Sequence, residues 1–102
     1  MAKYLLVYYG GKMETDPKLA EKTMATWMKW FADLGQAVVD AGAPTQPGKI
    51  VSKNGVKSAG AKPVGGYSIL QAESLNAAIK LAKGCPVLAV GGLVEVSPLV
   101  SM

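Results

Sequence analysis

The stretch KYLLVYY, residues 3–9, is apolar or aromatic on both of its alternating faces. Successive side chains of an extended strand point to opposite sides. One face therefore carries Tyr4, Leu6 and Tyr8, and the other carries Leu5, Val7 and Tyr9. A strand that is apolar on both faces is expected to be covered on both faces.

The composition predicts that this cover includes a second copy of the chain. The 102 residues have the length of one domain, and we treat 1–102 as a single domain. Half of the residues are hydrophobic and only 18% are charged, which is more apolar surface than a small domain readily buries alone. A symmetric dimer is the usual solution. We therefore expect a homodimer.

The residue types that are absent exclude several functions. All eleven basic residues are lysines, there is no histidine, and Cys85 is the one cysteine. Base readout and phosphate clamps rely on arginine, and general bases and zinc sites rely on histidine or cysteine clusters. We expect no metal, no cofactor and no nucleic-acid partner. Cys85 has no visible activator, so an inert thiol is favoured over a nucleophile.

The start of the chain gives an expectation about location. Residues 1–12 hold about six apolar residues before the glycine pair, too few for a signal sequence or a membrane span. We expect a soluble cytoplasmic protein without a membrane partner.

Two helices are expected between strands. Asp16 and Pro17 are typical of a helix start, Ser74 is a second N-cap, and Gly42 and Gly84 are expected to end the two helices. Apolar residues at helical spacing mark the buried stripe of the first helix: Ala20, Met24, Trp27, Met28, Phe31, Leu34 and Val38. Further strands are expected at 48–53, 64–71 and 93–97.

The order of these elements predicts the fold class. The sequence reads β-α-β twice, and its two helices leave through similar Gly-Ala-Pro and Gly-Cys-Pro segments. This order is typical of an α+β protein, a ferredoxin-like βαββαβ sandwich. We expect a four-stranded antiparallel sheet with both helices on one face.

The stretch SKNGVKSAGAKPVGGY, residues 52–67, has three interpretations: a phosphate-binding loop, a basic arm or a hairpin. A phosphate loop requires Lys and then Ser or Thr directly after its second glycine, but Ala61 follows Gly60. A nucleic-acid arm would interleave aromatic residues and arginines. Asn54-Gly55 is a turn dipeptide. We expect a hairpin with an exposed tip at 54–62.

The chain resembles the YCII-related family of small bacterial proteins, in particular its Asp-Gly-Pro-Phe branch. The matching segments are KYLLVYYG, GGYSILQAESLNAAIKLAKGCP and GGLVEVSPL, in the family's order. Counting back from Gly65 places Asn54-Gly55-Val56-Lys57 where the branch has its Asp-Gly-Pro-Phe motif. The glycine of the motif is kept, and the other three residues differ.

The resemblance implies a dimeric α+β barrel, in which two sheets face each other, and a cleft between sheet and helices. In some YCII-like members a His–Asp pair in this cleft is held to be catalytic. This chain has no histidine, so that chemistry does not transfer. The Asp-Gly-Pro-Phe branch is often found beside extracytoplasmic-function sigma factors and has no settled activity.

Five residues are candidates for a site. Glu95 lies in an apolar strand, where a dry cleft would make it an acid or base, and an edge strand facing water would make it an ordinary surface carboxylate. Tyr8 and Tyr67 could orient a ligand or simply pack. Trp30 borders the helical stripe as an interface anchor or a cleft wall. Asn54 is the polar residue at the motif position.

Two classes of function follow. The first is the binding of a small apolar or aromatic metabolite in the sheet–helix cleft, with or without chemistry, oriented by Tyr, Ser, Asn and Glu side chains. The second is a non-catalytic interaction or regulatory module that acts through the dimer surface.

Overall fold

The computed structural model describes residues 1–10, 16–61 and 63–100. Its regular elements are two helices, six strands and two short 3₁₀ turns. In chain order they are β1 (Ala2–Tyr9), α1 (Pro17–Leu34), a 3₁₀ turn (Gly35–Ala37), β2 (Val38–Pro44), β3 (Lys49–Ser52), β4 (Gly55–Ser58), β5 (Val64–Ala72), α2 (Leu75–Ala82), a 3₁₀ turn (Pro86–Val90) and β6 (Leu93–Pro98).

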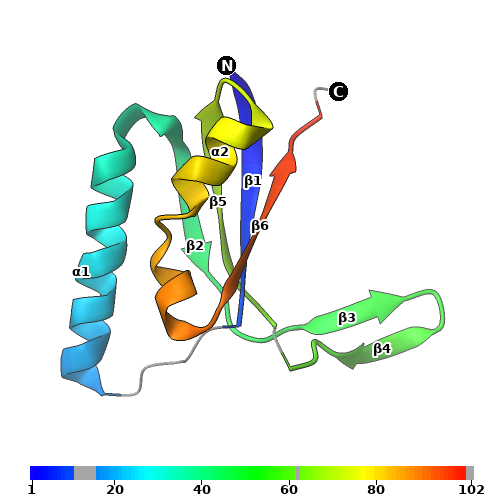
Figure 1. Ribbon diagram of the computed structural model, residues 1–102. Helices are drawn as coiled ribbons and strands as arrows, with labels where there is room; N and C mark the ends of the chain where they lie inside the picture. The colour runs from blue at the N-terminus through cyan, green and yellow to red at the C-terminus, as the bar shows by residue number, and fades with distance from the viewer. Residues whose placement is uncertain (11–15, 62, 101–102) are drawn as a thin grey trace.

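Four strands form one antiparallel sheet in the order β2-β5-β1-β6, and both helices lie on the same face of it (Figure 1). The α+β ferredoxin-like sandwich predicted from the sequence is confirmed. We call the side that carries α1 and α2 the helix face and the other side the open face. Within the described residues, no helix is both long enough and apolar enough to cross a membrane.

The predicted helix starts are confirmed in atomic detail. The Asp16 carboxylate accepts a hydrogen bond from the backbone N–H of Lys18 at 2.9 Å, and Pro17 occupies the first turn of α1. The Ser74 hydroxyl oxygen accepts one from the N–H of Ala77 at 3.1 Å. Each cap satisfies a backbone donor that has no partner within its helix.

The predicted end of the first helix is wrong. α1 ends at Leu34, because Gly35 adopts a φ of 57°, and the segment predicted as its last turns forms strand β2. Gly42, the predicted helix end, lies in β2, where a Cβ would overlap the carbonyl oxygen of Tyr67. Its φ of 74° also favours glycine. Gly42 thus allows β2 to approach β5 closely.

A strand is present within residues 48–53, as predicted, but it does not belong to the main sheet. β2 supplies the fourth strand of the main sheet, and β3 pairs with β4 in a separate two-stranded sheet. The hairpin interpretation of the glycine- and lysine-rich stretch is confirmed, with its turn at Lys53 and Asn54. The hairpin extends away from the rest of the domain (Figure 1).

The core lies between the sheet and the helices. Tyr4, Leu6 and Tyr8 on the helix face of β1 are buried, and Leu70 lies beside them on β5. The opposite side of β1 is only half-buried, because none of the described helices and strands covers the open face. Of the two faces of β1 that were predicted to be covered, a single chain therefore covers the helix face and leaves the open face partly exposed.

The buried stripe of α1 also differs from its prediction. Trp30, expected at the border of the stripe, is buried, and Trp27 is half-buried against Tyr8, with the two rings edge-to-face at 4.9 Å. Met24 and Met28 are exposed. These two positions of the predicted stripe thus face solvent and not the sheet.

One buried hydrogen-bond chain connects three strands. The Tyr8 hydroxyl in β1 donates to the Ser68 hydroxyl in β5 at 2.8 Å, and Ser68 donates to the carbonyl of Ala41 in β2 at 2.7 Å. Ser68 is fully buried and, within the described residues, no buried side-chain polar atom lacks a partner. Such a chain is favourable only when every member is satisfied.

This chain makes Ser68 more costly to remove than the hydroxyl of Tyr8. Ser68→Ala leaves both the Tyr8 hydroxyl and the Ala41 carbonyl without their partner, and we expect a loss of about 1–3 kcal/mol in the free energy of unfolding. Tyr8→Phe leaves Ser68 bonded to Ala41, and we expect a loss of about 1 kcal/mol. Urea unfolding measures both. A larger loss for Tyr8→Phe would contradict the arrangement.

Candidate functional site

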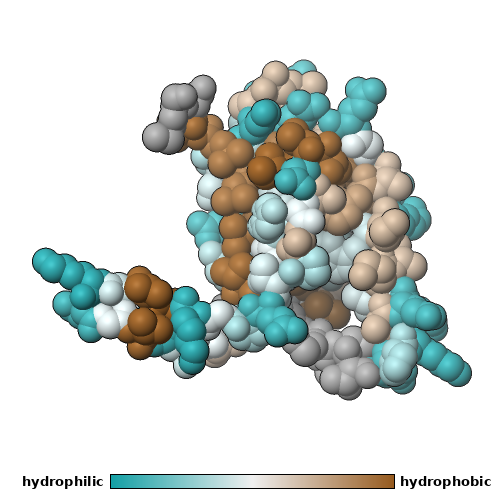
Figure 2. All heavy atoms as spheres, turned by 180° about the vertical axis from the view of Figure 1, so that it is seen from behind, coloured by the Kyte–Doolittle hydropathy of each residue, from teal (hydrophilic) through white to brown (hydrophobic). Residues whose placement is uncertain are grey.

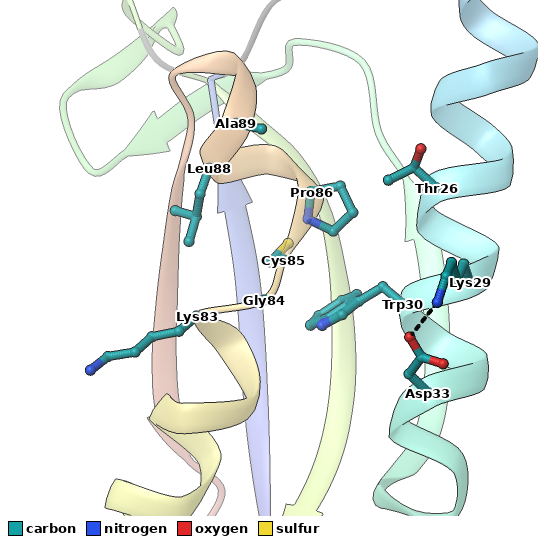
Figure 3. A pocket seen from close by; sticks show the side chains of 10 residues that line it. All are labelled: Thr26, Lys29, Trp30, Asp33, Lys83, Gly84, Cys85, Pro86, Leu88 and Ala89. Carbon is teal, nitrogen blue, oxygen red and sulfur yellow. Dashed lines mark hydrogen bonds and ion pairs between the residues drawn. The ribbon is translucent and has the colours of Figure 1, made fainter.

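A groove of about 530 Å³ opens on the helix side of the molecule, between α1 and the segment that connects α2 to β6 (Figure 3). We call it the Trp30 groove. Its lining residues come from the second half of α1 and from residues 83–89: Thr26, Lys29, Trp30, Asp33, Lys83, Gly84, Cys85, Pro86, Leu88 and Ala89. Apolar side chains form its depth, and charged side chains lie at its edge.

Trp30 forms the wall of the groove on the α1 side. It is only 8% exposed, and its ring lies 5.1 Å from that of Phe31 and 5.8 Å from that of Trp27, measured between centroids. Tyr8 supports this cluster from the sheet, with a centroid distance of 6.5 Å to Trp30. Aromatic pairs at these distances hold one another in place. The indole is therefore a fixed surface.

The indole N–H of Trp30 is a hydrogen-bond donor that the described residues leave unused. Across from it lies Gly84, and a Cβ at that position would be 3.2 Å from the indole nitrogen. The absence of a side chain at Gly84 thus keeps the N–H accessible. Since no buried side-chain polar atom of the described residues lacks a partner, this N–H is open to solvent, where it can donate to water or to an acceptor atom of a ligand.

The charged residues at the edge of the groove are mainly engaged with one another or turned away. Lys29 and Asp33 form an exposed ion pair at 3.1 Å, one turn apart on α1. Lys83 extends away from Trp30 in Figure 3. The interior of the groove therefore offers one donor and otherwise apolar contacts, which suits a small, largely apolar molecule.

Cys85 lies beside the indole of Trp30 but is not a reactive thiol. It is buried, and burial raises its thiol pKa to about 11 because the thiolate would lose its hydration. A thiol with this pKa is protonated at neutral pH. The expectation of an inert cysteine agrees with this environment.

Tyr8 is also held neutral by its surroundings. Burial raises its pKa to about 12, and this effect outweighs the opposing one of its hydrogen bond with Ser68. Its hydroxyl points to Ser68, so it supports the aromatic cluster from behind and does not line the groove.

Tyr67 and Glu95 lie on the other side of the sheet. Both are in register with Val7, Tyr67 in β5 and Glu95 in β6, and this places them on the open face. Tyr8 and Tyr67 do belong to adjacent central strands, but their side chains point to opposite faces. They cannot orient one ligand together.

Glu95 is an exposed residue of an edge strand, the second of its two predicted environments. Its carboxylate accepts a hydrogen bond from the Tyr9 hydroxyl at 2.8 Å. This bond raises the pKa of Tyr9, because the phenolate would lose the bond and face the carboxylate. Of the two alternatives, the dry sheet–helix cleft is therefore not the environment of Glu95.

Asn54 lies at the exposed turn of the β3–β4 hairpin. Of the five predicted site residues, Trp30 alone lines the groove, Tyr8 lies behind it, and the others are elsewhere. The sequence interpretation missed Gly84 as a site residue and used it only as a helix stop. Its signal is a glycine that directly precedes Cys85-Pro86.

Metal binding has no support in the described residues, which contain no group of three side chains able to hold an ion together.

An antiparallel four-stranded sheet with two helices on one face, and a groove beside the helices, defines a ferredoxin-like α+β domain. The sequence model of the YCII-related domain matches residues 1–102, and the chain belongs to this family. Its place in the Asp-Gly-Pro-Phe branch stays a prediction. No curated protein matched the chain.

The raised pKa of Tyr8 predicts an alkaline loss of stability. The unfolded chain ionises Tyr8 near its ordinary pKa of 10.0, whereas the folded chain resists ionisation until about 12. Stabilisation is therefore complete below pH 10 and lost as the pH rises to 12. Tyr8→Phe should show a shallower decline in unfolding free energy over this interval, measured by urea unfolding. Parallel curves for the two proteins would contradict the assignment.

Proposed function

We propose that this protein binds a small apolar or aromatic metabolite in the Trp30 groove, and that it does so as a cytoplasmic homodimer without metal or histidine chemistry. The observation that carries the proposal is the buried Trp30, whose unused indole N–H faces Gly84. A flat ring could stack or pack along the groove while an oxygen or nitrogen acceptor binds this N–H.

The geometry restricts the ligand in two ways. The groove volume of about 530 Å³ suits a molecule of metabolite size. Its donor is a neutral N–H, and the nearest charges, Lys29 and Asp33, already form an ion pair. A neutral or weakly polar acceptor, such as a carbonyl or phenol oxygen, is therefore favoured over a phosphate.

The dimer is supported by the open face. On the open face, Leu5 of β1 pairs with Ile69 of β5 and Val7 pairs with Tyr67, and Leu93 on β6 is more than half exposed. A second sheet packed on this surface would remove it from water. Residues 3–9 of each copy would then be covered on both faces, as their apolar pattern predicts. The groove lies on the helix side, so dimerisation leaves it open.

A second candidate function rests on the same surface. If the open face receives a different protein, the chain is an interaction or regulatory module without a ligand. The apolar residues of this face support that alternative. The oligomeric state of the pure protein and a ligand screen separate the two.

Ligand binding is tested with a metabolite screen by thermal shift. A saturating ligand of the Trp30 groove should stabilise the protein by a few kcal/mol. Gly84→Ala places a methyl group 3.2 Å from the indole nitrogen and should weaken binding of the hit at least about tenfold. Trp30→Phe keeps an aromatic wall, removes the N–H and should also weaken binding.

Glu95→Gln is the matched control, because it changes a polar residue on the opposite side of the sheet. It should leave the affinity for the hit unchanged. A screen without hits, or a hit that binds Gly84→Ala and the unchanged protein equally, would count against the groove as the site.

The dimer is tested by light scattering at micromolar concentration. The chain has a mass of 10.6 kDa, and we expect a particle of twice that mass, because the open face presents more apolar surface than a stable monomer usually exposes. A compact monomer under these conditions would contradict the barrel.

A further inference from the structure

The β3–β4 hairpin is an exposed element whose strands pair with no other described strand. Every residue from Lys49 to Ser58 is exposed, and the hairpin extends beyond the edge of the domain (Figure 1). Its two strands pair only with each other. A lone two-stranded hairpin is marginally stable in water, and it gains stability when one face packs on another surface.

The base of the hairpin is firmly attached. Thr45 connects to β5 through two hydrogen bonds of 2.9 Å, one from its backbone N–H to the carbonyl of Gly65 and one from its hydroxyl to the carbonyl of Val64. The carbonyl of Pro63 accepts a bond from the N–H of Gly10 at 3.0 Å. The hairpin therefore leaves the sheet in a defined direction.

One face of the hairpin is apolar at its centre. Val51 and Val56 lie directly opposite each other in the ladder and are 76% and 65% exposed. Their side chains share a face because paired residues of antiparallel strands point to the same side. The other face carries the pair Ile50 and Lys57.

The hairpin and the open face of the sheet present apolar surface toward the same side. Figure 2 views the molecule from behind the sheet and shows an apolar patch across the middle of the hairpin, together with apolar surface on the sheet. A body packed on the open face would therefore approach the hairpin from its apolar side.

We propose that the hairpin is a dimerisation arm, whose Val51–Val56 face packs on the second copy of this chain. The proposal rests on the homodimer proposed above and adds a second contact region to it. Charge complementarity favours another copy as the occupant: Lys49 shares the valine face, Lys53 lies at the turn, and Glu95 is exposed on the open face that the second copy presents. By two-fold symmetry the arm of each copy packs on the other copy.

The test compares dimer dissociation constants from sedimentation equilibrium. Val51→Thr/Val56→Thr keeps side-chain shape and strand preference while adding hydroxyls to the valine face. Because both arms of a dimer carry the change, we expect the dissociation constant to rise by about 100-fold. Ile50→Thr is the matched control on the other face of the same strand and should change the constant less than about threefold.

Circular dichroism and the urea midpoint at a concentration where each protein is monomeric establish that the variants are folded. The hairpin lies outside the core, so both variants should match the unchanged chain there. An unchanged dissociation constant for Val51→Thr/Val56→Thr, or equal weakening by Ile50→Thr, overturns the arm and leaves the sheet-mediated dimer standing. If the unchanged chain is monomeric at about 100 μM, where a dimer of micromolar affinity would be assembled, both proposals are overturned.

Discussion

The Tyr8–Ser68–Ala41 hydrogen-bond chain is the constraint on which the rest of the structure depends. It places polar groups in the centre of the core, where each must be satisfied, and it does so across β1, β5 and β2 at once. A shift of one residue in β1 or β5 would point Tyr8 or Ser68 to the open face and leave its partner unpaired, and a shift of β2 would move the Ala41 carbonyl away from Ser68. The chain therefore fixes the relative register of three of the four strands in the main sheet, and the tyrosine ring that it holds supports Trp27 and Trp30 above the sheet.

The groove is a consequence of that support. The aromatic cluster holds the indole of Trp30 against the segment after α2, and Gly84 leaves its N–H accessible where any other residue would cover it. Met24 and Met28 of α1 are exposed, whereas Trp27, Trp30 and Phe31 pack in or against the core. The sheet separates the groove from the open face. Ligand binding and assembly can thus occupy opposite sides of one small domain without competing for residues.

Part of the apolar surface that the described residues leave exposed lies on the open face and on the hairpin. The open face exposes side chains of β1, β5 and β6, and the hairpin adds Val51 and Val56 beyond the edge of the sheet. Glu95 lies within this surface with its carboxylate bonded to Tyr9, which supplies a defined negative group among apolar neighbours. A second copy would satisfy these surfaces by the hydrophobic effect and would make use of the charge pattern for its orientation.

Short-range sequence signals determined much of this protein. The strand at 3–9, the caps Asp16 and Ser74, the hairpin turn near Asn54 and the order of the β-α-β units follow from side-chain alternation, capping chemistry and turn preference, which act over a few residues. Tertiary structure decided where α1 ends and which segment is the fourth strand. Helical spacing continues formally to Val38, but pairing of residues 38–44 with β5 wins over it, because the pairing satisfies backbone groups of both segments. The face on which Glu95 lies and the meeting of Trp30 with Gly84 depend on strand register and on contacts between segments far apart in the chain. No pattern within either segment contains that information.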